Sequence, residues 1–271
     1  LEQLRFVLGT LLGKPELNTL WPLNLVLFSN QKEYGPHALP QPLLPGGSST
    51  LAAWTDDVPL PRDLMRAVTE TLLNDNAGRM PRDIEIALCD LLSTIEVNAT
   101  RVKIGAPLAS GELNGARMRA WAKLQMLATQ PEYSGRMRIY INNLQNAGEE
   151  DQASRNAFDM TAAKLDSMVD AYAKSAKFES APVNGKALNP NRDFIEKNLE
   201  RPAVTALLAD LDAKGKTFPP DSPRGLLVQN TVPSLGLAIK ANPKWAEPQF
   251  KLAALETDPG RKIGRLKMAA S

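Results

Sequence analysis

Histidine and cysteine are almost absent from this sequence of 271 residues, which contains one of each, His37 and Cys89. Most hydrolytic sites use histidine as a metal ligand or a base, so a zinc site built on two histidines is impossible here. A single cysteine also excludes an internal disulfide and a cysteine-rich zinc site. We interpret His37 as a surface loop residue, and Cys89, which lies beside Leu88 and Leu92, as a buried and inert thiol.

An excess of charge of one sign and long apolar runs are also missing. The formal net charge is +2, and the basic residues are scattered among acidic ones, which argues against binding to nucleic acid or an anionic membrane. No apolar run approaches the roughly 20 residues that a membrane-spanning helix needs, so we expect no membrane span. The sequence opens at Leu1 inside a helical pattern, from which we expect that its true start is missing.

Hydrophobic periodicity predicts helices mixed with a few short strands, which is the pattern of an α+β fold. The predicted elements of the first 177 residues are, in order, a helix over 2–12, a buried strand over 22–28, a loop over 35–48, a strand over 49–54, helices over 61–74 and from 81, a hairpin over 94–104, and helices throughout 111–177.

The remaining residues divide into a polar segment and a helical tail. Residues 178–225 are rich in polar residues, proline and glycine, and we predict a linker that contains one short helix over 202–212. Residues 226–271 have helical periodicity in three pieces, which are broken at Pro243 and Pro259.

Two adjoining runs carry a resemblance to a known family. The run LMRAVTETLLNDNAGRMP over 64–81 and its continuation RDIEIALCDLLST over 82–94 resemble the active-site helices of the bacterial peptidase-MA-like family of gluzincins. In that family the first run carries the zinc motif H-E-x-x-H, and the second carries a glutamate as the third ligand. The resemblance implies a zincin-like domain over 1–177, with a short sheet, helices and a mainly helical second lobe.

The catalytic positions depart from the family pattern completely. A gapless alignment, counted back from the proline that ends the loop, replaces the first histidine by Arg66, the water-activating glutamate by Ala67 and the second histidine by Glu70. The third ligand position falls on Ile86. A catalytic zinc needs three protein ligands, so the resemblance implies a degenerate domain with no catalytic residues, no metal and no cofactor. Arg66 and Glu70 lie four residues apart and could instead form an ion pair on the helix.

A second register of the same motif gives the same result. Aligning the motif with residues 69–73 keeps Glu70 in the place of the glutamate, but it supplies no histidine and requires a deletion in the loop. Neither register predicts a zinc hydrolase.

The tail is similar to a junction between tetratricopeptide repeats. The stretch LAIKANPKWAEPQFKLAA places Ala238, Pro243, Phe250 and Ala253 at the spacings of that repeat. Repeats of this kind usually bind proteins, so we expect Trp245 and Phe250 to contact a partner. Only about one repeat unit is present.

These features favour a non-catalytic pseudopeptidase that acts as a scaffold or accessory subunit of a larger protein complex. Two alternatives stay open. One is a tetratricopeptide-type adaptor in which the first domain is only a cap. The other is a hydrolase that uses carboxylates such as Glu70, Glu85 or Asp90 in the old cleft. Members of the resembled family are often exported, which implies the periplasm or cell envelope.

Overall fold

A computed structural model of the protein describes residues 1–39, 41–45, 50–98, 100–109, 111–175, 177–215, 226, 229–241, 243 and 246–270. The chain forms two compact units, Leu1–Lys214 and Gly215–Ser271. Helices predominate and a few short strands accompany them, so the expected mixture of helix and strand is confirmed at this level.

A three-stranded sheet forms one end of the first unit. Strand β1 (Leu23–Phe28) lies parallel to β3 (Thr50–Thr55), and the two-residue β2 (Leu44–Pro45) pairs antiparallel with the other side of β3. The short helix α2 (Gln31–Tyr34) follows β1, and a 3₁₀ turn (Gly35–His37) occupies part of the segment predicted as a loop.

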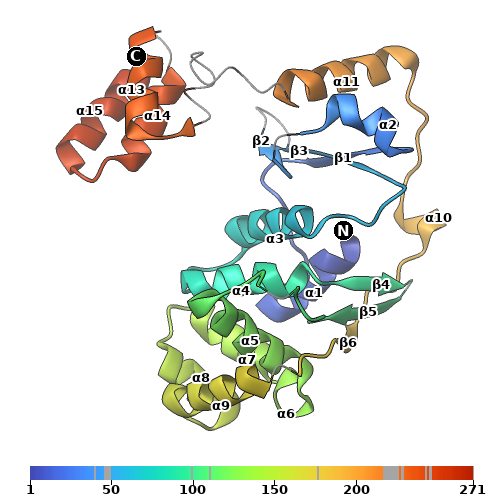
Figure 1. Ribbon diagram of the computed structural model, residues 1–271, viewed down its shortest axis with the longest axis vertical. Helices are drawn as coiled ribbons and strands as arrows, with labels where there is room; N and C mark the ends of the chain where they lie inside the picture. The colour runs from blue at the N-terminus through green and yellow to red at the C-terminus, as the bar shows by residue number, and fades with distance from the viewer. Residues whose placement is uncertain are drawn as a thin grey trace. The chain divides into compact units, whose positions relative to one another are not determined.

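The sheet has an apolar layer on each face. Leu23 and Leu25 pack against the main core, whereas Val26 and Phe28 pack on a second cluster that includes Leu211. Figure 1 shows α3 (Arg62–Asn76) on one side of the sheet and α2 and α11 (Arg201–Gly215) on the other. This two-sided covering explains why the sequence of β1 is almost continuously apolar.

The predicted helix pair lies beneath this sheet. Helix α3 and helix α4 (Arg82–Leu92) each begin directly after a proline, which stands at the N-cap and whose carbonyl oxygen accepts the first hydrogen bonds of the helix. The hairpin that follows is formed by β4 (Glu96–Asn98) and β5 (Arg101–Ile104), as the sequence predicts.

A helical lobe completes the first unit. Its elements are α1 (Glu2–Leu12), α5 (Gly115–Thr129), α6 (Pro131–Ser134), α7 (Met137–Gln145), α8 (Glu150–Phe158) and α9 (Ala162–Ser175). Trp121 and Tyr140 are the largest side chains that are fully buried, and both belong to the main core.

The segment expected to be a linker takes part in the first unit. Strand β6 (Ala181–Asn184) pairs antiparallel with β5, with Val183 opposite Val102, and completes a second sheet in the order β4-β5-β6. The sequence of this segment predicts a linker because it is polar and contains Pro182. An edge strand tolerates both features, since one of its sides has no strand partner, and β6 is such a strand. The short helix expected over 202–212 is α11, and its Leu211 is buried.

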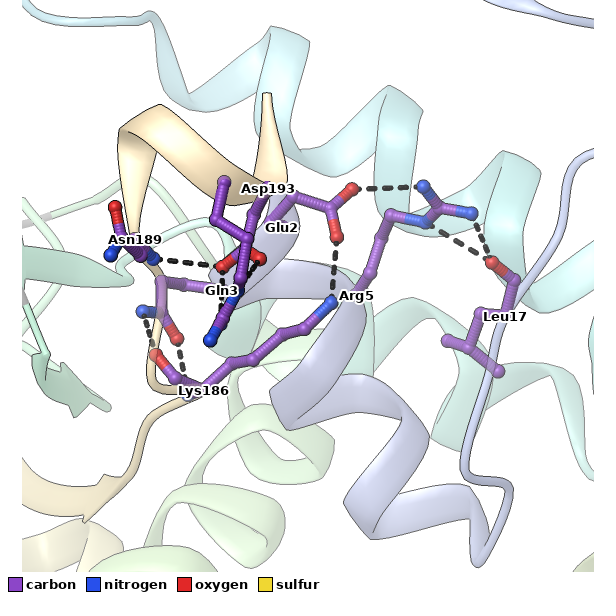
Figure 2. Close-up of polar contacts among 8 residues, drawn as sticks. Glu2, Gln3, Arg5, Leu17, Lys186, Asn189 and Asp193 are labelled. Carbon is purple, nitrogen blue, oxygen red and sulfur yellow. Dashed lines mark hydrogen bonds and ion pairs between the residues drawn. The ribbon is translucent and has the colours of Figure 1, made fainter. Parts of the chain in front are cut away.

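Hydrogen bonds from the first turn of α1 hold the residues that follow β6. Nε2 of the Gln3 side chain donates to the Lys186 backbone carbonyl oxygen at 2.9 Å, and Oε1 of the same side chain accepts from the Lys186 backbone amide at 2.8 Å (Figure 2). Glu2 pairs with Arg5 at 2.9 Å and with Lys186 at 3.3 Å. Partial burial opposes ionisation of Glu2, but hydrogen bonds from Arg5 and Lys186 lower its pKa.

The described part of the second unit includes the helices α13 (Val232–Ala241), α14 (Ala246–Leu255) and α15 (Pro259–Ala270). Helices therefore lie on both sides of the breaks predicted at Pro243 and Pro259, and Pro259 opens the last helix. Among the described residues of the second unit, Leu235 and Leu252 form a buried apolar cluster, and Ile239 packs against them. Nowhere in the described ranges is a helix both long and apolar enough to cross a lipid bilayer.

Candidate functional site

Helices α3 and α4 carry the residues that the sequence marks as vestigial, with Arg66, Ala67 and Glu70 on α3 and Ile86 on α4. Each helix buries one apolar face, with Leu64, Val68 and Leu72 on α3 and Leu88 and Leu91 on α4. The connection between them packs against the end of α7, since a Cβ atom on Gly78 would lie 2.4 Å from the Gln145 carbonyl oxygen.

A buried carboxylate on α4 joins two arginines from neighbouring helices. The Asp90 side chain is 1% exposed, and Arg117 of α5 donates to its two oxygens from Nε and Nη2, at 2.8 Å each. Arg66 Nε of α3 lies 2.9 Å from Asp90 Oδ1, at an angle that does not make a hydrogen bond. The hydrogen bond to Asp90 raises the pKa of Arg117. We call Arg66, Asp90 and Arg117 the Asp90 cluster.

A second set of charges lies on a more exposed side of the same two helices. Arg82 pairs with Glu70 at 2.6 Å and with Glu85 at 3.0 Å. Arg66 and Glu70 therefore do not form the ion pair that their spacing allows, because each has a closer partner on α4. The Arg82 side chain is 60% exposed, so these pairs contribute little to stability.

The sequence does not predict that Asp90 is the residue that joins α3 to α5. It stands among the apolar residues Leu88, Cys89 and Leu91, and its side chain lies with them beneath the surface. A charged residue inside the apolar face of a helix is the available signal, because such a group is buried only when it is paired. Glu85, five residues earlier, is partly exposed and pairs with Arg82, so the two carboxylates do not act together.

The residues at the vestigial positions do not fit zinc. Arg66 brings a positive charge to the place of the first ligand, and Ala67 and Ile86 have no donor atom. The oxygens of Asp90 already accept from Arg117, and Glu70 Oε1 accepts from Arg82. Within the described ranges, no three His, Cys, Asp or Glu side chains cluster in a way that could hold a metal ion.

Cys89 and His37 lie in surroundings that suit structural roles. Burial and the negative charge of Glu70 raise the pKa of the Cys89 thiol to about 12, so the reactive thiolate is scarce at neutral pH. The His37 ring stacks on Phe28, with ring centroids 5.2 Å apart.

A second buried charge lies on α5. Lys123, whose side chain is 7% exposed, contacts Glu150 at 2.5 Å and Asp166 at 2.8 Å, and the Tyr140 hydroxyl donates to Glu150 at 2.8 Å. Burial opposes the charge of Lys123, but hydrogen bonds to Asp166 and Glu150 raise its pKa. This lysine is a paired cation rather than a neutral base.

The groove between α4 and α5 encloses about 360 Å³. Its apolar wall includes Ile84, Ile86 and Ala120, and its cations are Arg117, Arg119 and Lys123. Each of these cations already contacts at least one carboxylate, as Arg119 does with Asp170 at 2.6 Å. The groove therefore does not present a free positive charge to an anion.

The two residues expected to contact a partner belong to the second unit. The Phe250 side chain on α14 is 62% exposed, as a contact residue requires. Trp245 lies outside the described residues.

A scan against protein-family models and searches of curated proteins and of solved structures find no match for this chain.

Proposed function

We propose that this protein is a non-catalytic pseudopeptidase, with a zincin-like first domain, that acts as a scaffold or accessory subunit through protein–protein contacts. The Asp90 cluster is the observation that supports the proposal. Two arginines and one carboxylate tie α3, α4 and α5 together, and one of them, Arg66, is aligned with the first zinc ligand of the resembled peptidases. Such a cluster fixes the spacing of helices and offers no general base, because its carboxylate is buried and paired.

Zinc binding tests the non-catalytic part of this proposal. We expect titration of the purified chain with Zn²⁺, followed by calorimetry and by metal analysis after dialysis, to give no stoichiometric site on α3. Tight binding of one zinc ion that disappears in Glu70→Ala would contradict the proposal, since Glu70 is the only carboxylate at the first three vestigial positions.

The native mass tests the scaffold part. We expect the protein, purified gently from its own source, to arrive in a complex of fixed stoichiometry whose other members mass spectrometry identifies. A lone monomer would contradict the scaffold role. Fractionation of the same cells tests the periplasm or cell envelope as the compartment, which rests on the family resemblance.

The exposed apolar side chains of the second unit favour one alternative, a tetratricopeptide-type adaptor. Leu237, Phe250, Ile263 and Met268 are all more than half exposed, so apolar side chains are available on the surface of this unit. If this unit is the binding element, deletion of residues 226–271 should abolish capture of the partner. If the first domain binds it, capture should survive the deletion.

A further inference from the structure

Edge strands of soluble proteins usually carry features that prevent another strand from pairing with them. Three of the four strands that end the two sheets follow this rule. β2 has two residues and includes a proline, β4 has three residues and includes Glu96, and β6 has four residues and includes Pro182. β1 differs from all three, because it has six residues, LNLVLF, without a charge, a proline or a glycine.

The backbone of β1 has a defined outer side. The carbonyl oxygens of Pro22 and Phe28 accept hydrogen bonds from the Thr50 and Asp56 amides, both at 2.8 Å. Backbone groups in a strand alternate in direction, so the groups of Asn24 and Val26 also face β3. Those of Leu23, Leu25 and Leu27 point outward, where no strand pairs with them in the part of the chain that the structure describes.

The side chains of β1 also suit a strand with neighbours on both sides. They contact apolar clusters on both faces of the sheet, yet none is fully buried, and Leu27 is 55% exposed. Just before the strand, Leu20 and Trp21 are 78% and 55% exposed. The open edge thus combines unpaired backbone groups with exposed apolar side chains.

We propose that β1 pairs with the β1 strand of a second copy of this chain, so that the two sheets join across a two-fold axis. A row of outward amides and carbonyls is satisfied by another extended strand. A two-fold axis requires the two identical strands to run antiparallel, and because β1 has no charge, no like charges oppose each other. This pairing goes beyond the proposed function and does not depend on it. Each copy offers one β1 edge, and the pairing occupies it, so the assembly ends at a dimer.

Sedimentation of the whole chain over a range of concentrations tests the pairing. We expect a dimer that dissociates on dilution, with a dissociation constant on the order of micromolar, because one strand pair is a small interface. Hydrogen exchange on the same samples should show that the Leu23, Leu25 and Leu27 amides are protected in the dimer and exchange in the monomer. A chain that stays monomeric up to ~100 μM, well above that constant, would overturn the proposal.

Three substitutions at Leu27 distinguish backbone pairing from non-specific hydrophobic association. Leu27→Pro removes an outward amide and leaves the hydrogen bonds to β3 in place, so it should give a monomer. Leu27→Thr keeps the amide and should still dimerise. If Leu27→Pro does not fold, as judged by circular dichroism, Leu27→Lys serves instead, because it adds a like charge from each copy at the shared edge. A dimer of undiminished affinity in the folded proline or lysine variant would overturn the proposal.

Discussion

A single buried carboxylate decides how three helices of the first unit are joined. Asp90 accepts two hydrogen bonds from Arg117 and lies beside Arg66, so its negative charge offsets two cations that are themselves partly covered. The net charge of the cluster is positive, and without the charge of Asp90 the two guanidinium groups would repel each other. We therefore expect that removing the charge of Asp90 destabilises the fold more than removing either arginine.

Asp90→Asn should test this expectation. Removing the charged partner of a buried pair is costly, and because both arginines are partly exposed we expect a loss of about 2–3 kcal/mol in the free energy of unfolding. Glu70→Gln is the matched control, since the Glu70–Arg82 pair is exposed and should contribute less than about 1 kcal/mol. Denaturant unfolding measures both. Equal losses of unfolding free energy in the two variants would mean that the buried cluster stabilises the fold no more than the exposed pair does.

Cys89 should be unreactive in the native protein. Its side chain lies on the apolar face of α4, and burial raises its pKa to about 12, so little thiolate exists at pH 8. We expect a thiol-specific reagent to modify the native chain at least ~100-fold more slowly than the chain in guanidinium chloride. Fast stoichiometric labelling of the folded protein would instead show that Cys89 is accessible.

At the scale of elements, β6 ties a segment expected to be a linker into the second sheet. Gly185 directly follows β6, and a Cβ atom there would lie 2.5 Å from the Thr100 carbonyl oxygen and 2.8 Å from Val102 Cγ2. The close approach of β6 to β5 therefore depends on a residue without a side chain.

Gly185→Ala should separate β6 from β5 or shift both strands. We expect a destabilisation of about 1–3 kcal/mol, as for other overpacked sites, together with faster exchange of the Val183 amide. Gly135→Ala is the control, because no atom lies within 4 Å of its Cβ position and its φ of −67° suits alanine. That variant should be neutral or slightly more stable. Wild-type stability in Gly185→Ala would mean that β6 is only loosely held.

Local sequence signals predict the elements of the first unit well. The helix over 2–12, the helix that follows Pro61 and the hairpin before residue 105 all form where periodicity and turn residues indicate them. The same signals do not reveal β6 or the pairing of Arg66 with Asp90, because both depend on partners far away in the sequence. The pairing of residues 181–184 with β5 is a long-range contact that Pro182 and Gly185 make hard to recognise.

At the scale of the whole molecule, the chain forms two compact units whose described apolar clusters differ greatly in size. Among the described residues, the buried ones of the main core and of the cluster around Leu51 come from residues 4–211, whereas the buried hydrophobic residues of the second unit are Leu235, Ala238, Leu252 and Ala253. A unit of this size is marginally stable, because a domain of about 60 residues buries only about 60% of the surface that its unfolded chain exposes.

Separate production of the two units should therefore give unequal results. We expect a chain that ends at residue 225 to keep the thermal unfolding transition of the first unit, because all of its buried clusters are retained. The segment 226–271 alone should show weak helicity by circular dichroism that increases when a binding partner is added. The reverse result, a cooperative fold in residues 226–271 and loss of the transition in residues 1–225, would mean that the second unit organises the first. Such a result would also favour the adaptor alternative, since the binding element would then be the stable part of the chain.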